Sequence, residues 1–403
     1  MDHPRPVVGV VGAGQLARMC WQAAIGLDID LRVLAARSDD AAATVLPNPR
    51  FGDPADPDAL RRFAAACDVL TLDHELVDLA TLRALEAEGC VVRPGADALR
   101  FAQDKAFQRT SFRTAGLPVP DFVVTDSLAA ARAFAADHGW PVVCKRPRGG
   151  YDGRGVWIVH DAAELAAVWA DIPEGDPVLV EQRVELEREV AVLIARRPGG
   201  EHTAAPLIET VQHDGMLRAL VVPAPVPAAV AQRALGLATR IVELVGVVGI
   251  CAIELFWTGG DLLINEIATR PHNSGHWTID GAVTSQFVNH LRAVLDLPVG
   301  SMAATAPAVC SVNVVGGAGA PPPGAGLARA LAVPDVAVHL YGKSARPGRK
   351  LGHVTAVADD VAAARRRAGE AASALAGEGA VTLAVDGGSG APEVTAGTAH
   401  RRP

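Results

Sequence analysis

Short apolar runs alternate with amphipathic stretches along the first hundred residues. The runs at residues 7–11, 30–36, 67–73 and 89–95 have the length and composition of buried strands, and residues 57–66 have the apolar spacing of a helix. Strands that alternate with helices form parallel sheets with right-handed crossovers. The pattern therefore predicts an α/β unit at the start of the chain.

A longer amphipathic stretch, residues 97–115, predicts one helix that ends at Gly116 and is followed by two prolines. The rhythm then changes to short strands and helices. Ser127 stands at the expected start of one helix, and Asp161 with Glu164 has the spacing of a capping box. We expect a domain boundary near Gly116 and a small α+β unit after it.

Strand patterns dominate the next part of the chain. The predicted elements are apolar strands at 187–197, 204–212, 217–225, 249–258 and 261–269, a helix at 228–245, and a loop at 316–326. Residues 336–358 predict two strands around a basic turn. The final segment, 385–403, has the composition of a flexible tail.

The composition is globular. Half of the 403 residues are hydrophobic and a fifth are charged, and this length suits two or three domains. The net charge of −8 argues against a general nucleic-acid-binding protein, which needs a positive surface. The longest apolar run, residues 244–257, is too short to cross a bilayer, and the N-terminus lacks a signal-peptide pattern. We therefore expect a cytoplasmic enzyme without a membrane or nucleic-acid partner, whose six scattered cysteines are small buried hydrophobes.

The stretch CKRPRGGYDGRGVWIV, residues 144–159, surrounds four glycines with cations. The glycines would let backbone N–H groups turn toward a polyphosphate, while Lys145 and Arg154 supply counter-charge. The segment is not a Walker A motif, because no Gly-Lys-Ser/Thr opens a helix. A mobile hairpin loop with solvated cations is the alternative.

The two apolar runs around TGGD, residues 258–261, predict a β-hairpin. A turn centred on Gly260 would bring Glu254 opposite Glu266, with Asn265 beside it. Two carboxylates that face each other in an apolar hairpin repel, and a hard cation such as Mg²⁺ would remove that penalty. The alternative is a register shifted by one residue, which would turn one glutamate to solvent.

A basic turn at residues 339–353 contains Lys343, Arg346, Arg349 and Lys350 within an acidic protein. Such a cluster is suited to binding a phosphate. Without further support, it could equally be a solvated turn.

The glycines Gly9, Gly12 and Gly14 resemble part of a dinucleotide-binding fingerprint and suggest an NAD-dependent oxidoreductase. Ala17 stands where the third glycine is expected, however, and the second strand ends in Ala-Ala-Arg at 35–37 where an acidic residue is expected. The NAD hypothesis is therefore the weaker alternative.

Several segments taken together resemble the N5-carboxyaminoimidazole ribonucleotide synthetases. They are VVGAGQLARM, KRPRGGYDGRG, VEQRVELEREVAV, the run from ELFWTGG through RPHNSGHWT to AVLDLP, and HLYGK with RPGRKLGH. This is a family of ATP-grasp ligases of de novo purine (IMP) biosynthesis. The likeness runs in order over residues 7–356. It implies a mixed α/β and α+β fold, with a Rossmann-like pre-ATP-grasp domain, an ATP-grasp fold that clamps a nucleotide between two sheets, and a small C-terminal β element. The implied boundaries are 1–115 for the first domain, 116–187 and 188–303 for the small and large ATP-grasp subdomains, 304–384 for the C-terminal element and 385–403 for a tail.

The resemblance also implies the reaction. ATP would phosphorylate bicarbonate to carboxyphosphate with the help of Mg²⁺, for which Mn²⁺ could substitute. The amine of 5-aminoimidazole ribonucleotide would then take the carboxyl group, either from carboxyphosphate or from released CO₂, under a glycine loop that excludes water. The family likeness suggests a homodimer.

Site residues carry over from the family by position. Those implied to bind ATP are Lys105, Lys145, Gly150, Tyr151, Asp152, Gly153, Arg154, Gly155, Val156, Glu181, Gln182, Arg183, Val184, Glu189, Gln212, Asn265 and Glu266. The metal ligands would be Glu254 and Glu266, and bicarbonate would meet Arg270, His272 and Asn273. The ribonucleotide would contact Gln15, Leu16, Glu75, Tyr151, Arg154, Lys343 and Arg349, with Lys343 also counted as catalytic.

Three positions depart from the family pattern. Residues 71–77 replace a run of phenylalanine and glutamate, so that only Glu75 carries over. Gln212 stands where some relatives have histidine. The spacing from Lys343 to Arg349 is one residue shorter than in some relatives. The alternatives within the superfamily are another carboxylate–amine ligase, either formate-using or similar to biotin carboxylase. A nucleotide sensor that has lost catalysis would be expected to lack the metal carboxylates.

Overall fold

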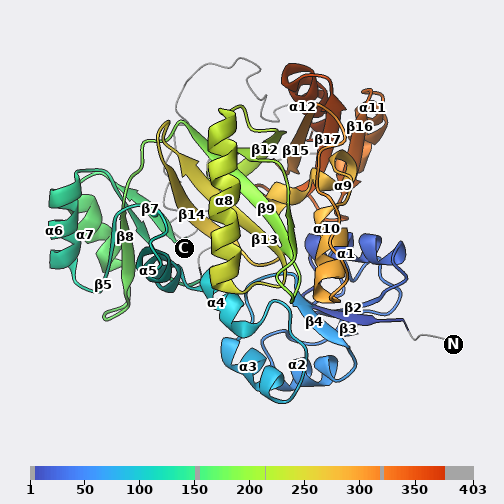
Figure 1. Cartoon of the computed structure of the whole chain (residues 1–403), viewed down its shortest axis with the longest axis horizontal. Coiled ribbons are helices and arrows are strands. Elements are labelled where there is room, and N and C mark those ends of the chain that lie inside the picture. The colour runs from blue at the N-terminus through green and yellow to red at the C-terminus, as the bar shows by residue number, and fades with distance from the viewer. Residues whose placement is uncertain (1–4, 150–154, 214, 318–321, 377–403) are drawn as a thin grey trace.

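The computed structural model describes residues 5–149, 155–213, 215–317 and 322–376. Their strands form three sheets. The N-terminal sheet and the small antiparallel sheet lie at different ends of the large central one (Figure 1). The mixed α/β and α+β fold expected from the sequence is confirmed.

The N-terminal sheet is parallel, with the order β3-β2-β1-β4. Its strands are β1 (Val7–Val11), β2 (Asp30–Ala35), β3 (Arg50–Phe51) and β4 (Val69–Leu72), and its helices include α1 (Gln15–Ile25), α2 (Pro57–Ala64) and α3 (Leu79–Ala87). The strand expected at 89–95 is reduced to a single bridge between Leu70 and Val92. Pro94 has no N–H to donate, so the ladder stops there.

The single helix expected at 97–115 is wrong. Two helices, α4 (Ala96–Gln103) and α5 (Lys105–Thr114), meet at Asp104. Asp104 has an extended backbone, with φ −121° and ψ 97°, and its carboxylate accepts a hydrogen bond from the N–H of Phe107 at 2.9 Å. An aspartate that caps a helix in this way competes with continuation of the preceding helix. The break leaves Lys105 as the first residue of α5.

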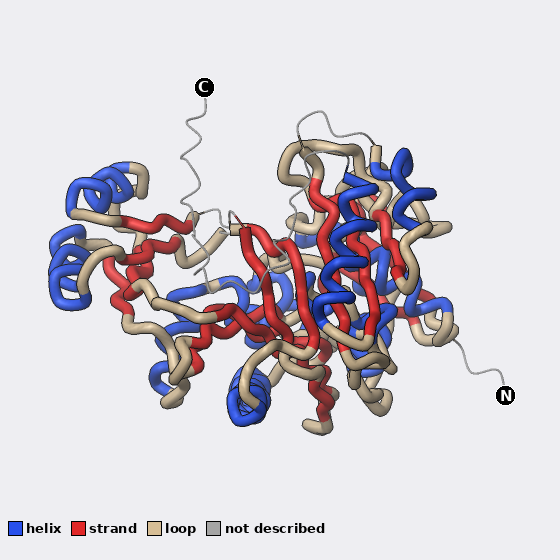
Figure 2. Tube along the Cα trace, turned by 90° about the horizontal axis from the view of Figure 1, so that it is seen from above, coloured by secondary structure: helices blue, strands red, loops and turns tan. Residues whose placement is uncertain are grey.

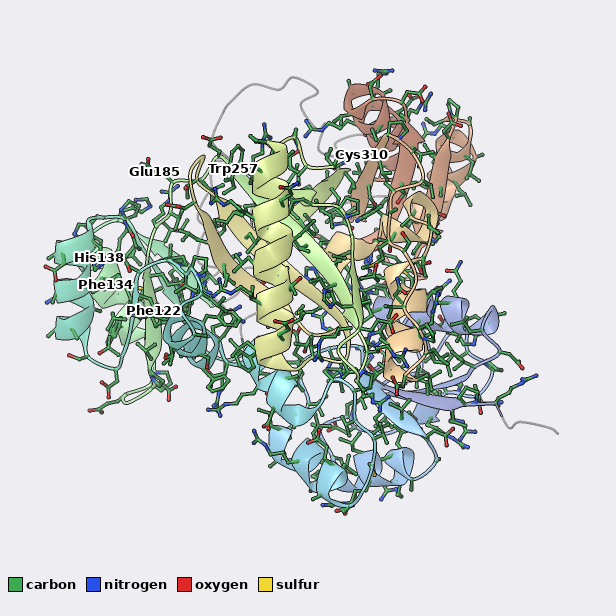
Figure 3. The ribbon with its side chains drawn as sticks, in the orientation of Figure 1. Phe122, Phe134, His138, Glu185, Trp257 and Cys310 are labelled. Atoms are coloured by element: carbon green, nitrogen blue, oxygen red, sulfur yellow. The ribbon has the colours of Figure 1, made fainter. Side chains whose placement is uncertain are left out.

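The small sheet is antiparallel, with the order β5-β8-β6-β7. Its strands are β5 (Phe122–Thr125), β6 (Val142–Lys145), β7 (Val156–Val159) and β8 (Val178–Gln182), and its helices are α6 (Leu128–His138) and α7 (Ala162–Ala170). Ser127 and Asp161 cap these helices as predicted. The Phe134 and His138 rings stack 4.1 Å apart on α6 (Figure 3). Both helices lie on the outer face of the sheet (Figure 2), which leaves the other face toward the large sheet.

The large sheet has the order β14-β13-β9-β11-β12-β15-β17-β16, and β10 also pairs with β9. Its strands are β9 (Arg188–Arg196), β10 (His202–Ala204), β11 (Ile208–His213), β12 (Met216–Val222), β13 (Gly249–Trp257), β14 (Leu262–Ala268), β15 (Ala308–Val315), β16 (Val336–Leu340) and β17 (Lys350–Ala358). The long helix α8 (Ala228–Val245) covers β9, β13 and β14 on one face (Figure 1). Apolar side chains of β9, β13 and β14 pack there against α8.

Several shorter elements and one long helix complete the fold. They are η1 (Asn273–Gly275), α9 (Thr278–Gly281), α10 (Gln286–Val294), η2 (Pro323–Gly326), α11 (Leu327–Leu331) and α12 (Val361–Ala376). The sequence analysis did not predict α12, which packs on β15 and β17 through Ala364, Ala368, Ala371 and Leu375. The C-terminal element is therefore a sheet extension covered by a helix rather than strands alone. The tail predicted at 385–403 lies outside the described residues.

The cysteine prediction is confirmed in its main point. All six are free; Cys20, Cys144, Cys251 and Cys310 are buried, whereas Cys67 and Cys90 are partly exposed. Cys310 lies inside the packed C-terminal region (Figure 3). Among the described residues, none of the helices is both long and apolar enough to cross a membrane.

Candidate active site

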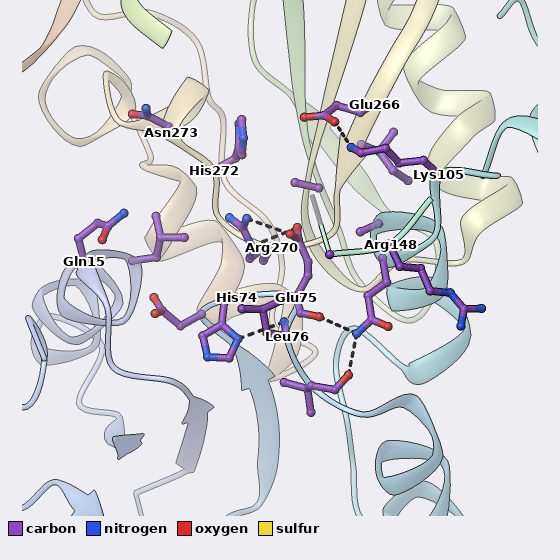
Figure 4. Close-up of a pocket in the computed structure, with 18 of the residues that line it drawn as sticks. Gln15, His74, Glu75, Leu76, Lys105, Arg148, Glu266, Arg270, His272 and Asn273 are labelled. Carbon is purple, nitrogen blue, oxygen red and sulfur yellow. Dashed lines mark hydrogen bonds and ion pairs between the residues drawn. The ribbon is translucent and has the colours of Figure 1, made fainter. Parts of the chain in front are cut away.

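Two adjoining cavities lie where the three sheets approach one another. The first, of about 290 Å³, is lined by residues of the small sheet and of β9, β13 and β14. The second, of about 720 Å³, is lined by the N-terminal domain and by the segment after β14 (Figure 4). Both are lined by Lys105, Glu266, His272, Asn273 and Lys350. A molecule bound in one cavity would therefore adjoin a molecule bound in the other.

The hairpin of β13 and β14 supplies two carboxylates to the first cavity. Glu254 pairs directly with Glu266, as predicted, and Asn265 is the extra residue of a β-bulge in this ladder. Both glutamates and Asn265 line the first cavity, while their neighbours Ile253, Ile264 and Ile267 are buried in the core. Burial, and then the charge of Glu266, raise the pKa of Glu254. The alternative register, with one glutamate turned to solvent, is excluded.

Lys105 lies beside these carboxylates. Its Nζ atom is 2.6 Å from Oε2 of Glu266 (Figure 4). Burial lowers the pKa of Lys105, but the charge and hydrogen bond of Glu266 outweigh this effect and leave the pKa above its usual value. The charge of Lys105 in turn holds the pKa of Glu266 well below its usual range. The pair is ionised at neutral pH.

A second ion-paired cluster stands on the small sheet. Glu181 of β8 forms a short contact with Arg109 of α5, and its other oxygen lies 2.5 Å from Nζ of Lys145. The side chains of Arg109 and Glu181 are only 2% and 3% exposed. Burial alone would raise the pKa of Glu181, but the two cations outweigh it and lower the pKa to about 2. The Glu181 side chain is therefore engaged by protein cations, while β8 ends at Gln182 and the chain continues along the cavity wall to Val184.

Glu189 of β9 lines the same cavity as Glu254 and Glu266. Burial raises the pKa of Glu189 to about 7, against the opposing hydrogen bond from Gln212. Gln212 stands at a bulge in the pairing of β11 with β12. The bulge interrupts the regular ladder at the residue that contacts Glu189.

Arg270, His272 and Asn273 line the second cavity directly after β14. The Arg270 guanidinium lies 3.2 Å from both carboxylate oxygens of Glu75, which joins the N-terminal domain to this segment (Figure 4). Nδ1 of His272 accepts a hydrogen bond from the N–H of Ser274 and lies 2.9 Å from the Ser274 hydroxyl, and Nε2 lies 3.9 Å from Oε1 of Glu254. In a neutral ring, the bond from the N–H of Ser274 favours the tautomer with its proton on Nε2. Among the described residues, the buried Nδ2 of Asn273 has no hydrogen-bond partner.

At the far end of the second cavity, Lys343 donates a hydrogen bond to Oε1 of Gln15 at 2.5 Å. Gln15 and Leu16 are the first residues of α1 and both line the cavity. Arg349 donates to the carbonyl and hydroxyl of Ser344 and lines neither cavity. Lys343 itself lines neither cavity, and it contacts the wall of the second cavity through Gln15.

The fold therefore gathers most of the predicted site residues around these cavities. Gly150, Tyr151, Asp152, Gly153 and Arg154 lie outside the described residues, and Gly155 lines neither cavity although the next residue, Val156, lines both. The remaining predicted residues on the cavity walls are Gln15, Leu16, Glu75, Lys105, Lys145, Glu181, Gln182, Arg183, Val184, Glu189, Gln212, Glu254, Asn265, Glu266, Arg270, His272 and Asn273.

Sequence reasoning missed several residues that build the site. Asp73 accepts hydrogen bonds from the N–H groups of Gly14 and Ala17 at 2.7 and 2.8 Å and so caps α1, and a side chain at Gly14 would overlap its carboxylate. Arg109 was missed because nothing in its local sequence indicates a buried ion pair. The N-cap role of Asp104 could have been found, since an aspartate directly before a helical run is a start signal.

Comparisons with known proteins agree with this architecture. Residues 6–103 match the ribonucleotide synthetase preATP-grasp domain, residues 110–287 the ATP-grasp domain, and residues 310–367 the phosphoribosylaminoimidazole carboxylase C-terminal domain. The fold and these family matches identify the chain as an ATP-grasp ligase.

Curated relatives and solved structures narrow the assignment. The chain is 47% identical over 371 residues to the N5-carboxyaminoimidazole ribonucleotide synthase of Mycobacterium tuberculosis H37Rv, with 90% of this chain and 86% of that protein covered. The enzyme of Corynebacterium ammoniagenes is 41% identical, with 92% of each chain covered. The Aspergillus clavatus enzyme complexed with ATP superposes with a TM-score of 0.85 at 31% identity, covering 92% of this chain and 98% of that one. The chain belongs to the N5-carboxyaminoimidazole ribonucleotide synthase family, which confirms the resemblance and sets aside the NAD-dependent alternative.

Proposed function

We propose that this chain uses ATP and bicarbonate to carboxylate 5-aminoimidazole ribonucleotide to N5-carboxyaminoimidazole ribonucleotide in purine biosynthesis. The observation that carries the proposal is the direct pairing of Glu254 with Glu266 in a cavity also lined by Lys105 and Lys145. The names of the relatives support the reaction, and a solved relative from Aspergillus clavatus is described in complex with ADP and 5-aminoimidazole ribonucleotide.

ATP would occupy the first cavity. Apolar side chains such as Val143, Ile158 and Phe256 offer contacts for adenine, and the strand end at 181–184 offers backbone groups for its edge. Glu189 is suited to accept hydrogen bonds from the ribose hydroxyls. The remaining predicted ATP residues, including the loop 150–156, stay part of this proposal.

Lys105 and Lys145 would bind the phosphates of ATP. A phosphate beside Lys105 would share its ammonium group with Glu266, which lies 2.6 Å from it. Burial lowers the pKa of Lys145, but the charge of Glu181 opposes this effect. The pKa of Lys145 stays below its usual value, but its ion pair with Glu181 favours the ammonium form, and both lysines are suited to bind a triphosphate.

Glu254, Glu266 and the amide oxygen of Asn265 fit a magnesium ion. Mg²⁺ prefers carboxylate and amide oxygens, and a bound cation would offset both the burial and the repulsion from Glu266 that raise the pKa of Glu254. When bound, the ion would neutralise charge on the transferred phosphoryl group. Mn²⁺ is expected to substitute, because it accepts the same oxygen ligands.

Bicarbonate would bind where the two cavities meet. Asn273 offers a buried N–H group that has no partner among the described residues, and the neutral tautomer favoured by the Ser274 contact would place the His272 proton on Nε2. Arg270 adds positive charge, part of which Glu75 already balances. These donors are suited to a small oxyanion beside the phosphates of ATP.

The amine substrate would occupy the second cavity, with Gln15, Leu16 and Glu75 on its wall and Lys343 beside Gln15. Tyr151, Arg154 and Arg349 remain proposed phosphate contacts.

An oxygen of bicarbonate would attack the γ-phosphorus, which expels ADP and forms carboxyphosphate. The amine would then attack the carboxyl carbon, or CO₂ released beside it, with loss of phosphate and a proton. The junction of the cavities would limit escape of either species.

Three wider expectations belong to the same proposal. We propose a cytoplasmic homodimer and the subdomain boundaries 1–115, 116–187, 188–303 and 304–384. Size-exclusion chromatography with light scattering would test the dimer, and a monomer at assay concentrations would contradict it.

An ADP-release assay tests the reaction. Wild-type protein should release ADP at full rate only with both bicarbonate and 5-aminoimidazole ribonucleotide, whereas Glu266→Gln should lose at least about a hundredfold in rate, because an electrostatic contact to the transferred phosphoryl group is lost. Formate-dependent or biotin-dependent ADP release would instead favour another carboxylate–amine ligase. Full activity of Glu266→Gln would overturn the metal assignment.

A further inference from the structure

The segment that follows β14 is held by one buried side chain from a distant helix. Gln286 is the first residue of α10 and is fully buried. Its Oε1 accepts a hydrogen bond from the N–H of His272 at 3.0 Å, and its Nε2 donates to the carbonyl of the same residue at 2.8 Å. The carboxamide therefore pairs with the main chain of His272 as a neighbouring strand would.

Further contacts fix the Gln286 amide from the other side. Its Nε2 also lies 3.3 Å from Nδ1 of His276, and its own backbone N–H donates to Thr278 Oγ1 at 2.9 Å. A Cβ atom at Gly275 would lie 2.4 Å from the Gln286 side chain, so glycine is required for this approach. These contacts hold the Gln286 side chain in this position.

We propose that Gln286 is the positioning residue for the bicarbonate end of the active site, an inference that rests on the function proposed above. Gln286 lines neither cavity and would touch no substrate. It fixes the main chain from which the His272 ring and the Asn273 amide project into both cavities. Since His272 Nε2 lies 3.9 Å from Glu254, a shift of this segment would move the oxyanion donors relative to the proposed metal ligands.

The same helix provides a matched control. Asn289, also in α10 and fully buried, accepts from the N–H of Gly300 at 2.7 Å and donates to its carbonyl at 2.9 Å. Gly300 lines neither cavity. Asn289 thus makes the same pair of hydrogen bonds to a segment that carries no proposed site residue. The two side chains differ in the main chain that they bind, which is His272 for Gln286 and Gly300 for Asn289.

The test compares Gln286→Glu with Asn289→Asp. Each change keeps the shape and removes the N–H donor to a backbone carbonyl. Both should lower Tm by similar amounts. Only Gln286→Glu should raise KM for bicarbonate and lower kcat by about tenfold to a hundredfold, because small misplacement of reacting groups has effects of this size. Its KM for ATP should stay within about twofold, since the part of the first cavity proposed for adenine and ribose is lined by residues of other elements, and it should release more ADP per product formed.

Equal kinetic parameters in the two variants, or an equal rise of KM for ATP and bicarbonate in Gln286→Glu, would overturn the proposal. If Gln286→Glu does not fold, Gln286→Met provides the same comparison without introducing a charge, and an unchanged KM for bicarbonate in that variant would also overturn it. A wild-type protein whose ADP release ignores bicarbonate would instead overturn the proposed function, and this inference with it.

Discussion

Glu254 of β13 lies directly opposite Glu266 of β14, and Asn265 is the extra residue that makes this pairing possible. From the turn, the ladder starts with Trp257 opposite Leu262 and reaches Leu255 opposite Ile264. A regular continuation would pair Glu254 with Asn265 and turn Glu266 into the core. The bulge keeps both carboxylates on the cavity side and adds the Asn265 side chain to the same cavity wall.

This pairing predicts that Mg²⁺ binding depends on pH. Burial and the charge of Glu266 raise the pKa of Glu254, so this carboxyl takes up a proton at a higher pH than usual. A proton competes with a metal ion for the carboxylate. Affinity for Mg²⁺ should therefore weaken as the pH falls through neutrality, which calorimetric titration in the presence of a non-hydrolysable ATP analogue would measure.

The Glu254→Gln variant is the control for that titration. It should bind Mg²⁺ more weakly at every pH and lose most of the pH dependence. Any slope that remains would be attributed to Glu189, whose pKa is raised to about 7 by burial. An unchanged slope in Glu254→Gln would contradict the assignment.

Asp104 is expected to matter for ATP binding through Lys105. Asp104→Ala removes the cap of α5 and the ion pair with Arg148, which should lower stability by about 1 kcal/mol and displace the lysine that follows. We expect KM for ATP to rise several-fold. Asp56 caps α2 away from both cavities, so Asp56→Ala should lower stability similarly and leave KM for ATP unchanged. Identical kinetics in the two variants would refute the link.

The buried pair of Arg109 and Glu181 predicts a large stability effect. Arg109→Met leaves Glu181 with one cationic partner, and breaking a buried pair is strongly destabilising, by about 3 kcal/mol. Urea denaturation would measure the loss. Arg188→Met, at a more exposed pair with Glu209, should lose less. A loss for Arg109→Met no greater than that of the control would contradict the prediction.

His290 predicts acid sensitivity of folding. Its Nδ1 accepts from the N–H of Ile250 and its Nε2 contacts Thr71, so the ring joins α10, β13 and β4 in the neutral form. Burial lowers its pKa to about 3, below its usual value of 6.5. Below that usual value the unfolded chain binds a proton that the folded chain excludes. Stability should fall by about 1.4 kcal/mol per pH unit between these two values, for this residue alone.

Thermal unfolding at a series of pH values would measure this loss, with His290→Gln as the comparison. The variant should be less stable near neutral pH but should show a shallower decline in acid. Buried His276 and His353, whose pKa values burial also lowers, contribute a remaining slope in both proteins. Parallel curves for the two proteins would argue against a role for His290.

Much of the fold was accessible from local patterns. Strand β1 and helix α8 were predicted with the bounds that the structure gives, and Ser127 and Asp161 cap their helices as expected. The pairing of Glu254 with Glu266 was predicted correctly, but from a turn that was assumed to be centred on Gly260. The turn is centred between Gly259 and Gly260, and the bulge at Asn265 restores the predicted pairing.

The sequence by itself determined most of the elements and predicted the paired carboxylates, because periodicity, capping residues and turn glycines act within a few residues of the backbone. The family was indicated by the resemblance of several sequence motifs. Tertiary structure alone decided which charges meet. Lys105 pairs with Glu266 across 161 positions, Arg109 with Glu181 across 72, and Gln286 reaches back 14 positions to hold His272. Such partners depend on how helices and sheets pack, and the free energy of burying an ionised or polar group selects them only once the surrounding core has formed.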